Sequence, residues 1–179
     1  MNDKNILVHI CCGPCGAAFV PGIINGGFTP VLLWHNHNIH PYTEYQSRKN
    51  AAIDFANSYC LKIETDNNYG LRDFLARMPD FDTRCASCYE KRLEYTAARA
   101  KEHGFAKFST TLLASPYQNF DLICELGRKI GAAHGLEFVI RDFRAGYRDA
   151  LKKARANGLY MQKYCGCIFS EEERYHNLN

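Results

Sequence analysis

The chain has 179 residues, of which 46% are hydrophobic, and a net charge of +3. This length is typical of one domain, expected over residues 1–179, which can bury a core without disulfide bonds. No apolar run is long enough to span a membrane, and the run before Cys11 is too short for a secretion signal. We therefore expect a cytoplasmic protein whose cysteines serve metal or redox chemistry. The charge is too small to indicate a nucleic-acid partner by itself.

Strand and helix patterns alternate along the chain. Apolar runs predict strands at residues 5–10, 30–34, 62–65, 106–111 and 137–140. Helical apolar spacing and glycine stops predict helices at residues 17–25, 42–59, 87–103, 121–134 and 147–157, and a capping box of Ser170 and Glu173 predicts a short last helix. The alternation is typical of an α/β fold, here a Rossmann-like, mostly parallel sheet with helices on both faces. Ligands of such sheets bind beyond the carboxyl ends of the strands, where we expect a metal site.

Seven of the nine cysteines form three groups, which are Cys11-Cys12-Gly13-Pro14-Cys15, Cys85-Ala86-Ser87-Cys88 and Cys165-Gly166-Cys167. Thiolates select iron–sulfur clusters, zinc or copper(I), and C-x-x-C spacing lets two thiolates bind one metal centre. Spacing alone leaves zinc and a 4Fe-4S cluster as alternatives, and the spare thiols favour iron–sulfur, because a structural zinc site is closed. The C-x-C group is typical of an easily reduced catalytic disulfide, with further metal ligands as the alternative. We interpret Cys60 and Cys124 as core residues.

Histidines and basic residues allow two readings each. His9 lies inside a predicted strand, which favours a hydrogen-bonded core histidine over a ligand. The polar loop with His35, His37 and His40 is interpreted as a hydrogen-bonding loop rather than a metal site. Basic residues between positions 141 and 163 recur at the spacing of one helical face and either follow a phosphate backbone or form a solvated face. They include Arg144, Arg148, Lys152 and Arg155.

Six segments, taken in chain order, resemble the cobalamin-independent epoxyqueuosine reductases of the QueH type. They are His9–Cys15, Asn36–Pro41 with Glu44-Tyr45, Arg84–Cys88, Thr110–Tyr117, Arg141–Arg144 and Gln162–Cys167. Two positions depart from the pattern, where His37 replaces a frequent proline and Gln118 a frequent lysine. Neither departure changes a cysteine.

The resemblance implies an oxidoreductase that performs the last step of queuosine biosynthesis. It would remove the epoxide oxygen from epoxyqueuosine at the wobble position of tRNAs with GUN anticodons. The resemblance also implies a redox-active pair at Cys165 and Cys167, a second iron beside the cluster with Cys15 as candidate ligand, and a 4Fe-4S cluster. The implied ligands of that cluster are Cys11, Cys12, Cys85 and Cys88.

Reduction of an epoxide to an alkene takes two electrons and two protons, so an electron store beside the cluster and an external electron donor are expected. Tyr164, Asp142 and Tyr117 are candidate proton donors. Bases of an anticodon loop stack on aromatic rings, and Tyr42, Tyr45, Tyr117 and Tyr164 are candidates for this role. Other candidate substrate-binding residues are Ser115, Arg141, Arg144, Arg148 and Lys152. The rival classes are a zinc-stabilised tRNA-binding module and a cluster-free thiol–disulfide oxidoreductase.

Overall fold

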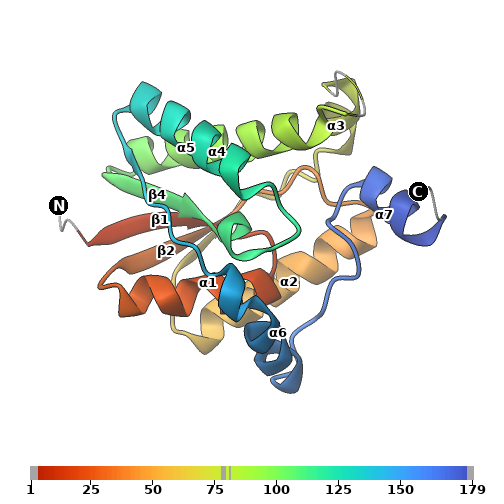
Figure 1. Cartoon of the computed structure of the whole chain (residues 1–179), viewed down its shortest axis with the longest axis horizontal. Coiled ribbons are helices and arrows are strands. Elements are labelled where there is room, and N and C mark those ends of the chain that lie inside the picture. The colour runs from red at the N-terminus through yellow and green to blue at the C-terminus, as the bar shows by residue number, and fades with distance from the viewer. Residues whose placement is uncertain (1–3, 78–79, 81, 177–179) are drawn as a thin grey trace.

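A computed structural model describes residues 4–77, 80 and 82–176 of the chain. Its centre is a sheet of five parallel strands in the order β3-β2-β1-β4-β5 (Figure 1). The strands are β1 (Asn5–His9), β2 (Thr29–Trp34), β3 (Ile63–Thr65), β4 (Lys107–Thr110) and β5 (Glu137–Phe138). Each strand pairs in parallel with its neighbours, as the alternation of strands and helices predicted.

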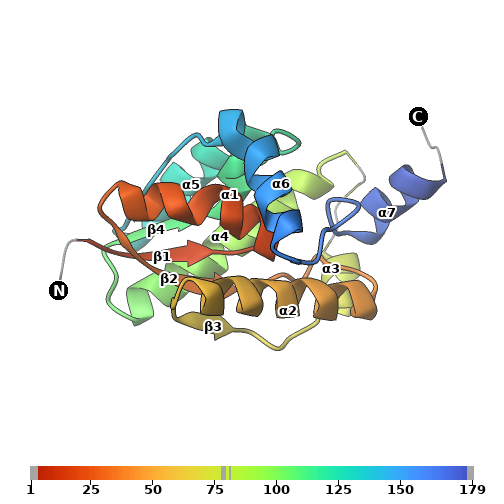
Figure 2. The ribbon, with the colours of Figure 1, turned by 90° about the horizontal axis from the view of Figure 1, so that it is seen from below.

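Helices cover both faces of the sheet (Figures 1 and 2). On one face lie α1 (Gly13–Asn25) and α2 (Tyr42–Ser58), with α6 (Tyr147–Ala156) packed on α1. On the other face lie α4 (Arg84–Glu102) and α5 (Phe120–His134). The shorter helices are α3 (Leu71–Ala76) and α7 (Ile168–Tyr175), with 3-10 turns η1 (Thr111–Ala114) and η2 (Arg144–Gly146). The predicted fold class is confirmed.

The central strand is buried from both sides. Ile6, Leu7 and Val8 of β1 are at most 1% exposed. A strand covered by helices on both faces needs a continuous apolar run rather than an alternating one. This is why the short run before Cys11 forms the middle of the sheet.

The order in which the chain adds strands to the sheet reverses at β1, which is the topological switch point. From β1 it runs outward through β2 to β3, and it then returns to the other side of β1 to form β4 and β5. Ligands of such sheets bind in the crevice beside this switch point. The turn after β1 and the turn after β4 are therefore neighbours, and the backbone N–H of Cys11 donates to Thr111 Oγ1 at 3.2 Å.

Helices α1 and α4 begin four and three residues earlier than the sequence predicted, and both changes involve cysteines. Helix α1 begins at Gly13, because Cys12 caps it and Pro14 fits a first helical turn. Helix α4 begins at Arg84, so the Cys85 and Cys88 group lies inside its first two turns.

Two other predictions differ from the structure at the ends of elements. The predicted capping box of Ser170 and Glu173 is wrong, because α7 begins at Ile168 and its N-cap is Cys167, whose sulfur accepts from the Ser170 N–H. Cys60 is not a core residue, since it is exposed in the turn after α2, at a φ of 53°. Cys124 is buried, as predicted.

In the part of the chain that the structure describes, none of the helices combines the length and the apolar character needed to cross a bilayer.

Close packing of α1 against α2 fixes the cysteine turn. A Cβ atom at Gly13 would lie 2.6 Å from the backbone oxygen of Ala51 in α2. We expect Gly13→Ala to lower the free energy of unfolding by about 1–3 kcal/mol, because a main-chain atom cannot move aside as a side chain can. Urea unfolding measures this change.

Gly146→Ala is the matched control. Among the described residues no atom comes within 4 Å of a Cβ placed at Gly146, so this substitution should cost less than about 1 kcal/mol. Equal losses in the two variants would contradict the packing argument.

Candidate metal centre and substrate cavity

Three thiols gather at the turn between β1 and α1. The sulfur atoms of Cys11, Cys12 and Cys15 all lie within 4.8 Å of one another, and those of Cys11 and Cys12 are 3.9 Å apart. Cys12 is the N-cap of α1, and its sulfur accepts from the Cys15 N–H at 3.3 Å. The first turn of α1 therefore offers a backbone N–H donor to sulfur at the point where β1 ends.

Proton sharing within this group favours a thiolate on Cys11. Hydrogen bonds from Cys12 and Cys15 lower the pKa of the Cys11 thiol well below its usual value. Burial raises the pKa of Cys12, and the hydrogen bond to Cys11 raises that of Cys15. Thr111 adds a hydroxyl 3.4 Å from the Cys11 sulfur. Within the group, negative charge is therefore favoured on Cys11 over Cys12 and Cys15, and all three sulfurs are of the donor type that soft metals select.

The second cysteine group stands apart from the first. Within the described residues, Cys11, Cys12 and Cys15 are the one set of three potential metal ligands that lie within 4.8 Å of one another, and Cys85 and Cys88 are outside it. Burial raises the pKa of Cys88 to about 12. Negative charge on Cys165 and Cys167 adds to the rise in pKa for both α4 cysteines, so the second and third groups lie near each other.

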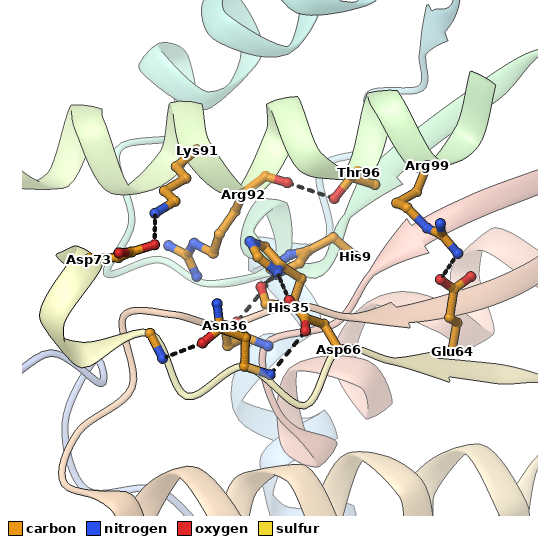
Figure 3. A network of polar contacts seen from close by, with 12 residues as sticks. His9, His35, Asn36, Glu64, Asp66, Asp73, Lys91, Arg92, Thr96 and Arg99 are labelled. Atoms are coloured by element: carbon orange, nitrogen blue, oxygen red, sulfur yellow. Dashed lines mark hydrogen bonds and ion pairs between the residues drawn. The ribbon is translucent and has the colours of Figure 1, made fainter. Parts of the chain in front are cut away.

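A buried cation lies between the cysteine groups. Arg92 of α4 is 2% exposed, and its Nη2 has no hydrogen-bond partner in the part of the chain that the structure describes, while its Nε donates to the Cys88 carbonyl oxygen at 3.2 Å. Figure 3 shows the side chain reaching from α4 toward the loop that carries Asn36. Among the described residues no carboxylate forms an ion pair with Arg92. The negative charges that would stabilise it most are thiolates. In order of effect, those are Cys88, Cys165 and Cys11.

The Arg92 guanidinium, which has no ion-pair partner among the described residues, tests whether the site suits a metal group. A buried charge without a partner costs several kcal/mol of folding free energy. An anionic, thiolate-ligated group between the first and second cysteine groups would supply the missing partner of Arg92. Soft sulfur donors and a nearby unpaired cation together fit an iron–sulfur cluster.

A second buried guanidinium, that of Arg48, forms hydrogen bonds with the main chain of the third cysteine group. Arg48 of α2 is 2% exposed and pairs with Glu44 at 2.6 Å. Its Nη1 donates to the Cys165 carbonyl oxygen at 2.8 Å and its Nη2 to that of Tyr164 at 2.9 Å. Gly166 follows with a φ of 145°, a left-handed conformation that favours glycine. These contacts hold the C-terminal loop against the cysteine turn.

A cavity of about 460 Å³ opens between the cysteine turn, η1, α6 and the C-terminal loop. Thiols of the first and third groups, both buried guanidinium groups and several polar side chains line it. Its lining includes Cys11, Cys15, Arg48, Arg92, Ser115, Tyr117, Gln118, Tyr147, Gln162, Lys163, Tyr164, Cys165 and Arg174. Sequence reasoning missed Arg48, Arg92 and Tyr147, although each guanidinium lies one helical turn from a residue of a matched segment, Glu44 or Cys88.

The histidines only partly follow the prediction. His9 is a hydrogen-bonded core residue, as expected, because Nδ1 contacts Thr110 Oγ1 at 2.9 Å and Nε2 contacts Asn36 Oδ1 at 3.2 Å (Figure 3). Burial lowers its pKa to about 3, so the ring is neutral. His35 pairs with Asp66 at 2.7 Å. Both ring nitrogens of buried His40 lack a partner among the described residues, so a hydrogen-bonding loop describes only part of this segment.

Three predicted substrate-binding residues line the cavity, and they are Ser115, Tyr117 and Tyr164. Tyr117 is 80% exposed at its edge. Tyr45 is a correction, since it is 1% exposed and its hydroxyl donates to the Asp66 carbonyl oxygen, which leaves no face for stacking. Tyr42 is 53% exposed but is not among the residues found to line the cavity.

The predicted proton donor Asp142 is also a correction. Arg144 binds both of its carboxylate oxygens, at 2.9 and 2.7 Å, and these hydrogen bonds lower the pKa of Asp142. It is therefore a carboxylate at neutral pH and holds no proton to give. Arg141 and Arg144 are exposed, and the Arg144 guanidinium lies 4.2 Å from the ring centroid of Phe120.

Comparison with known proteins decides the family. The sequence model of the epoxyqueuosine reductase QueH family matches residues 6–173. The chain belongs to this family. It is therefore an oxidoreductase, and the resemblance found in the sequence is confirmed. Epoxyqueuosine reductase QueH of Dehalococcoides mccartyi is 34% identical over 97% of this chain and 96% of its own, and that of Thermotoga maritima is 33% identical over 94% and 91%.

A solved structure outside the QueH family shares the fold. The U34-tRNA thiolase NcsA from Methanococcus maripaludis, solved with its 4Fe-4S cluster, superposes with a TM-score of 0.63 at 13% identity. The match covers 95% of this chain and 62% of the thiolase chain. At this identity the similarity establishes the α/β fold alone.

Removal of the buried charge should stabilise the metal-free protein. In this QueH family member we expect Arg92→Met to raise the free energy of unfolding of the metal-free protein by about 1–3 kcal/mol, because an unpaired buried cation is replaced by an apolar chain. Urea unfolding after metal removal measures it. Arg92→Lys keeps the charge and should give no such gain. A less stable metal-free Arg92→Met protein would contradict the unpaired-charge interpretation.

Proposed function

We propose that this chain reduces epoxyqueuosine to queuosine at the wobble position of tRNA, the last step of queuosine biosynthesis, and that residues 1–179 form one domain. The observation that carries the proposal is the cavity. In a chain of the QueH family, thiols from two distant segments, Cys11 with Cys15 and Cys165, open onto one cavity of about 460 Å³. A volume of this order suits a nucleoside-sized ligand.

The cofactor of the proposed reaction is a 4Fe-4S cluster, which would supply single electrons. Its proposed ligands lie at the start of α1 and the start of α4. They are Cys11, Cys12, Cys85 and Cys88. Arg92 supports this set, because its guanidinium is stabilised by negative charge on both Cys88 and Cys11. Cys15 remains the proposed ligand of a second iron.

The two electrons and two protons of the reaction need further groups from the protein. The Cys165 and Cys167 dithiol is the proposed second electron store. Tyr164 donates its hydroxyl proton to the His40 carbonyl oxygen at 2.5 Å, so this proton is already engaged. Tyr147, which sequence reasoning missed, also lines the cavity, and burial raises its pKa. Tyr147 thus holds its proton at neutral pH and is a further candidate donor.

The proposed tRNA-binding surface is the rim of the cavity. Tyr117 offers an exposed ring for stacking, and the anticodon bases of tRNA stack on such rings. Helix α6 borders the cavity through Tyr147 and Leu151, and exposed Arg148 and Lys152 continue the same helix. A basic surface beside the opening suits the phosphates that flank the target base.

Serine substitutions separate ligands from the dithiol. We expect Cys12→Ser and Cys88→Ser to lose most iron and sulfide, because each removes one thiolate of the cluster. We expect Cys165→Ser and Cys167→Ser to keep the cluster spectrum and lose turnover of epoxyqueuosine-containing tRNA. Anaerobic purification, metal and sulfide analysis and a visible spectrum measure the first outcome.

The same measurements test the rivals. Colourless protein that contains zinc and no sulfide would support a zinc-stabilised tRNA-binding module. Turnover by the Cys12→Ser and Cys88→Ser proteins without iron would support a cluster-free thiol–disulfide oxidoreductase. Cluster loss in Cys165→Ser or Cys167→Ser would make those residues metal ligands.

Charge reversal tests the tRNA surface. The double variant Arg148→Glu/Lys152→Glu should bind tRNA at least tenfold more weakly at low salt and with a flatter salt dependence, because fewer phosphate contacts release fewer counterions. Binding titrations over a range of salt concentrations measure both. Arg128→Glu/Lys129→Glu is the matched control, since this pair is exposed on α5, on the opposite face of the sheet. Equal losses in both double variants would exclude the α6 surface as the binding site.

A further inference from the structure

The two cysteines of the third group have different surroundings. Cys165 is exposed and lines the cavity. Cys167 is half-buried, is not found among the described residues that line the cavity, and caps α7 through the Ser170 N–H, which donates to its sulfur at 3.4 Å. The pair therefore presents one sulfur to the substrate space and keeps the other at a helix start.

A series of hydrogen bonds connects Tyr89 of α4, through Gln118, to the exposed sulfur of Cys165. The Gln118 amide nitrogen Nε2 donates to Cys165 Sγ at 3.4 Å. The Tyr89 hydroxyl of α4 donates to the Gln118 oxygen Oε1 at 2.8 Å. Tyr89 is in turn an acceptor for the Asn119 N–H at 3.4 Å.

The order of donors in this chain fixes which end of the amide faces sulfur. A backbone N–H can only donate, so the Tyr89 hydroxyl accepts from Asn119 and gives its own proton to an acceptor. The Gln118 oxygen is that acceptor, which turns the NH₂ group toward Cys165. A flipped amide would place its oxygen against the sulfur and its NH₂ against the Tyr89 proton, losing both hydrogen bonds.

We propose that Gln118, oriented by Tyr89, is a positioning residue that makes Cys165 the dithiol member facing the substrate, with Cys167 as the partner that completes the disulfide. The inference rests on the proposed redox role of the pair. The hydrogen bond from the neutral amide holds the Cys165 sulfur in place without bringing a charged group into the cavity.

The step balances as a two-electron exchange. The two S–H bonds of Cys165 and Cys167 break and one S–S bond forms between them, which releases two electrons and two protons. The 4Fe-4S cluster, when bound, would carry these two electrons singly to the epoxide, whose two carbons form the alkene while its oxygen leaves with both protons as water. An external dithiol then reduces the disulfide and restores the pair.

Alkylation rates test the positioning role. Cluster-loaded protein is reduced, treated anaerobically with iodoacetamide for short times, and the modified cysteines are located by mass spectrometry. Exposed Cys60, which lies after α2 and away from the site, provides the internal reference rate. We expect Cys165 to react faster than Cys167. In Gln118→Leu the Cys165 rate should fall about threefold relative to Cys60, because the donor that holds its sulfur toward the cavity is lost, with no change at Cys167. Tyr89→Phe should give a smaller fall in the same direction.

Gln162→Leu is the matched control, since its amide donates to Cys15 Sγ at 3.7 Å in the same cavity. It should leave the alkylation rate of Cys165 unchanged. Gln118→Leu should also lower kcat for modified tRNA with little change in KM, because the tRNA surface is intact.

The outcomes distinguish this inference from the function on which it rests. An unchanged Cys165 rate in Gln118→Leu, while Cys165→Ser and Cys167→Ser still abolish turnover, would overturn the role of Gln118 alone. Full turnover by both serine variants would overturn the dithiol role itself. Equal slowing of Cys165 and Cys167 in Gln118→Leu would show a general disturbance of the loop and would also overturn the positioning role.

Discussion

Buried positive charge facing sulfur is the constraint on which this structure depends. Arg48 comes from the helix layer on one face of the sheet and Arg92 from the layer on the other, and both are 2% exposed. Charge inside a protein needs an opposite charge or a full set of hydrogen bonds. Arg48 has both, from Glu44 and from two carbonyl oxygens of the C-terminal loop. Arg92 has neither among the described residues, although its Nε donates to the Cys88 carbonyl oxygen. An anionic group held by the neighbouring cysteines would supply the missing partner.

The strand order explains how distant segments reach the candidate metal centre. Because β1 lies between β2 and β4, the turns that follow β1 and β4 open side by side at the switch point. Thr111 shows the result, since its hydroxyl accepts from the Cys11 N–H and lies next to the Cys11 sulfur. Helix α4 then brings the second cysteine group across the same end of the sheet, and the C-terminal loop brings the third. Each contributes from a different layer, which is why no single segment forms the site.

Short-range patterns predicted the fold class, the cysteine turn at the end of β1 and the core position of His9. Those features follow from local apolar runs and helix signals, which a sequence displays directly. Side chains whose roles depend on distant partners were beyond such reasoning. The sequence suggested a stacking role for the Tyr45 ring, but packing against distant residues buries it. It also suggested Asp142 as a proton donor, but Arg144 pairs with its carboxylate. The sequence pattern favoured Ser170 as the helix cap, because a hydroxyl is the usual acceptor at this position and a sulfur is rare. In the structure Cys167 caps α7 instead.

Arg48 binds the C-terminal loop through main-chain carbonyl oxygens and not through side chains. These hydrogen bonds to carbonyl oxygens do not depend on the oxidation state of the neighbouring Cys165 sulfur. The loop can therefore keep its place in the proposed redox cycle of Cys165, because the anchor does not involve the sulfur. The proposed cycling of the sulfur would thus leave its support unchanged.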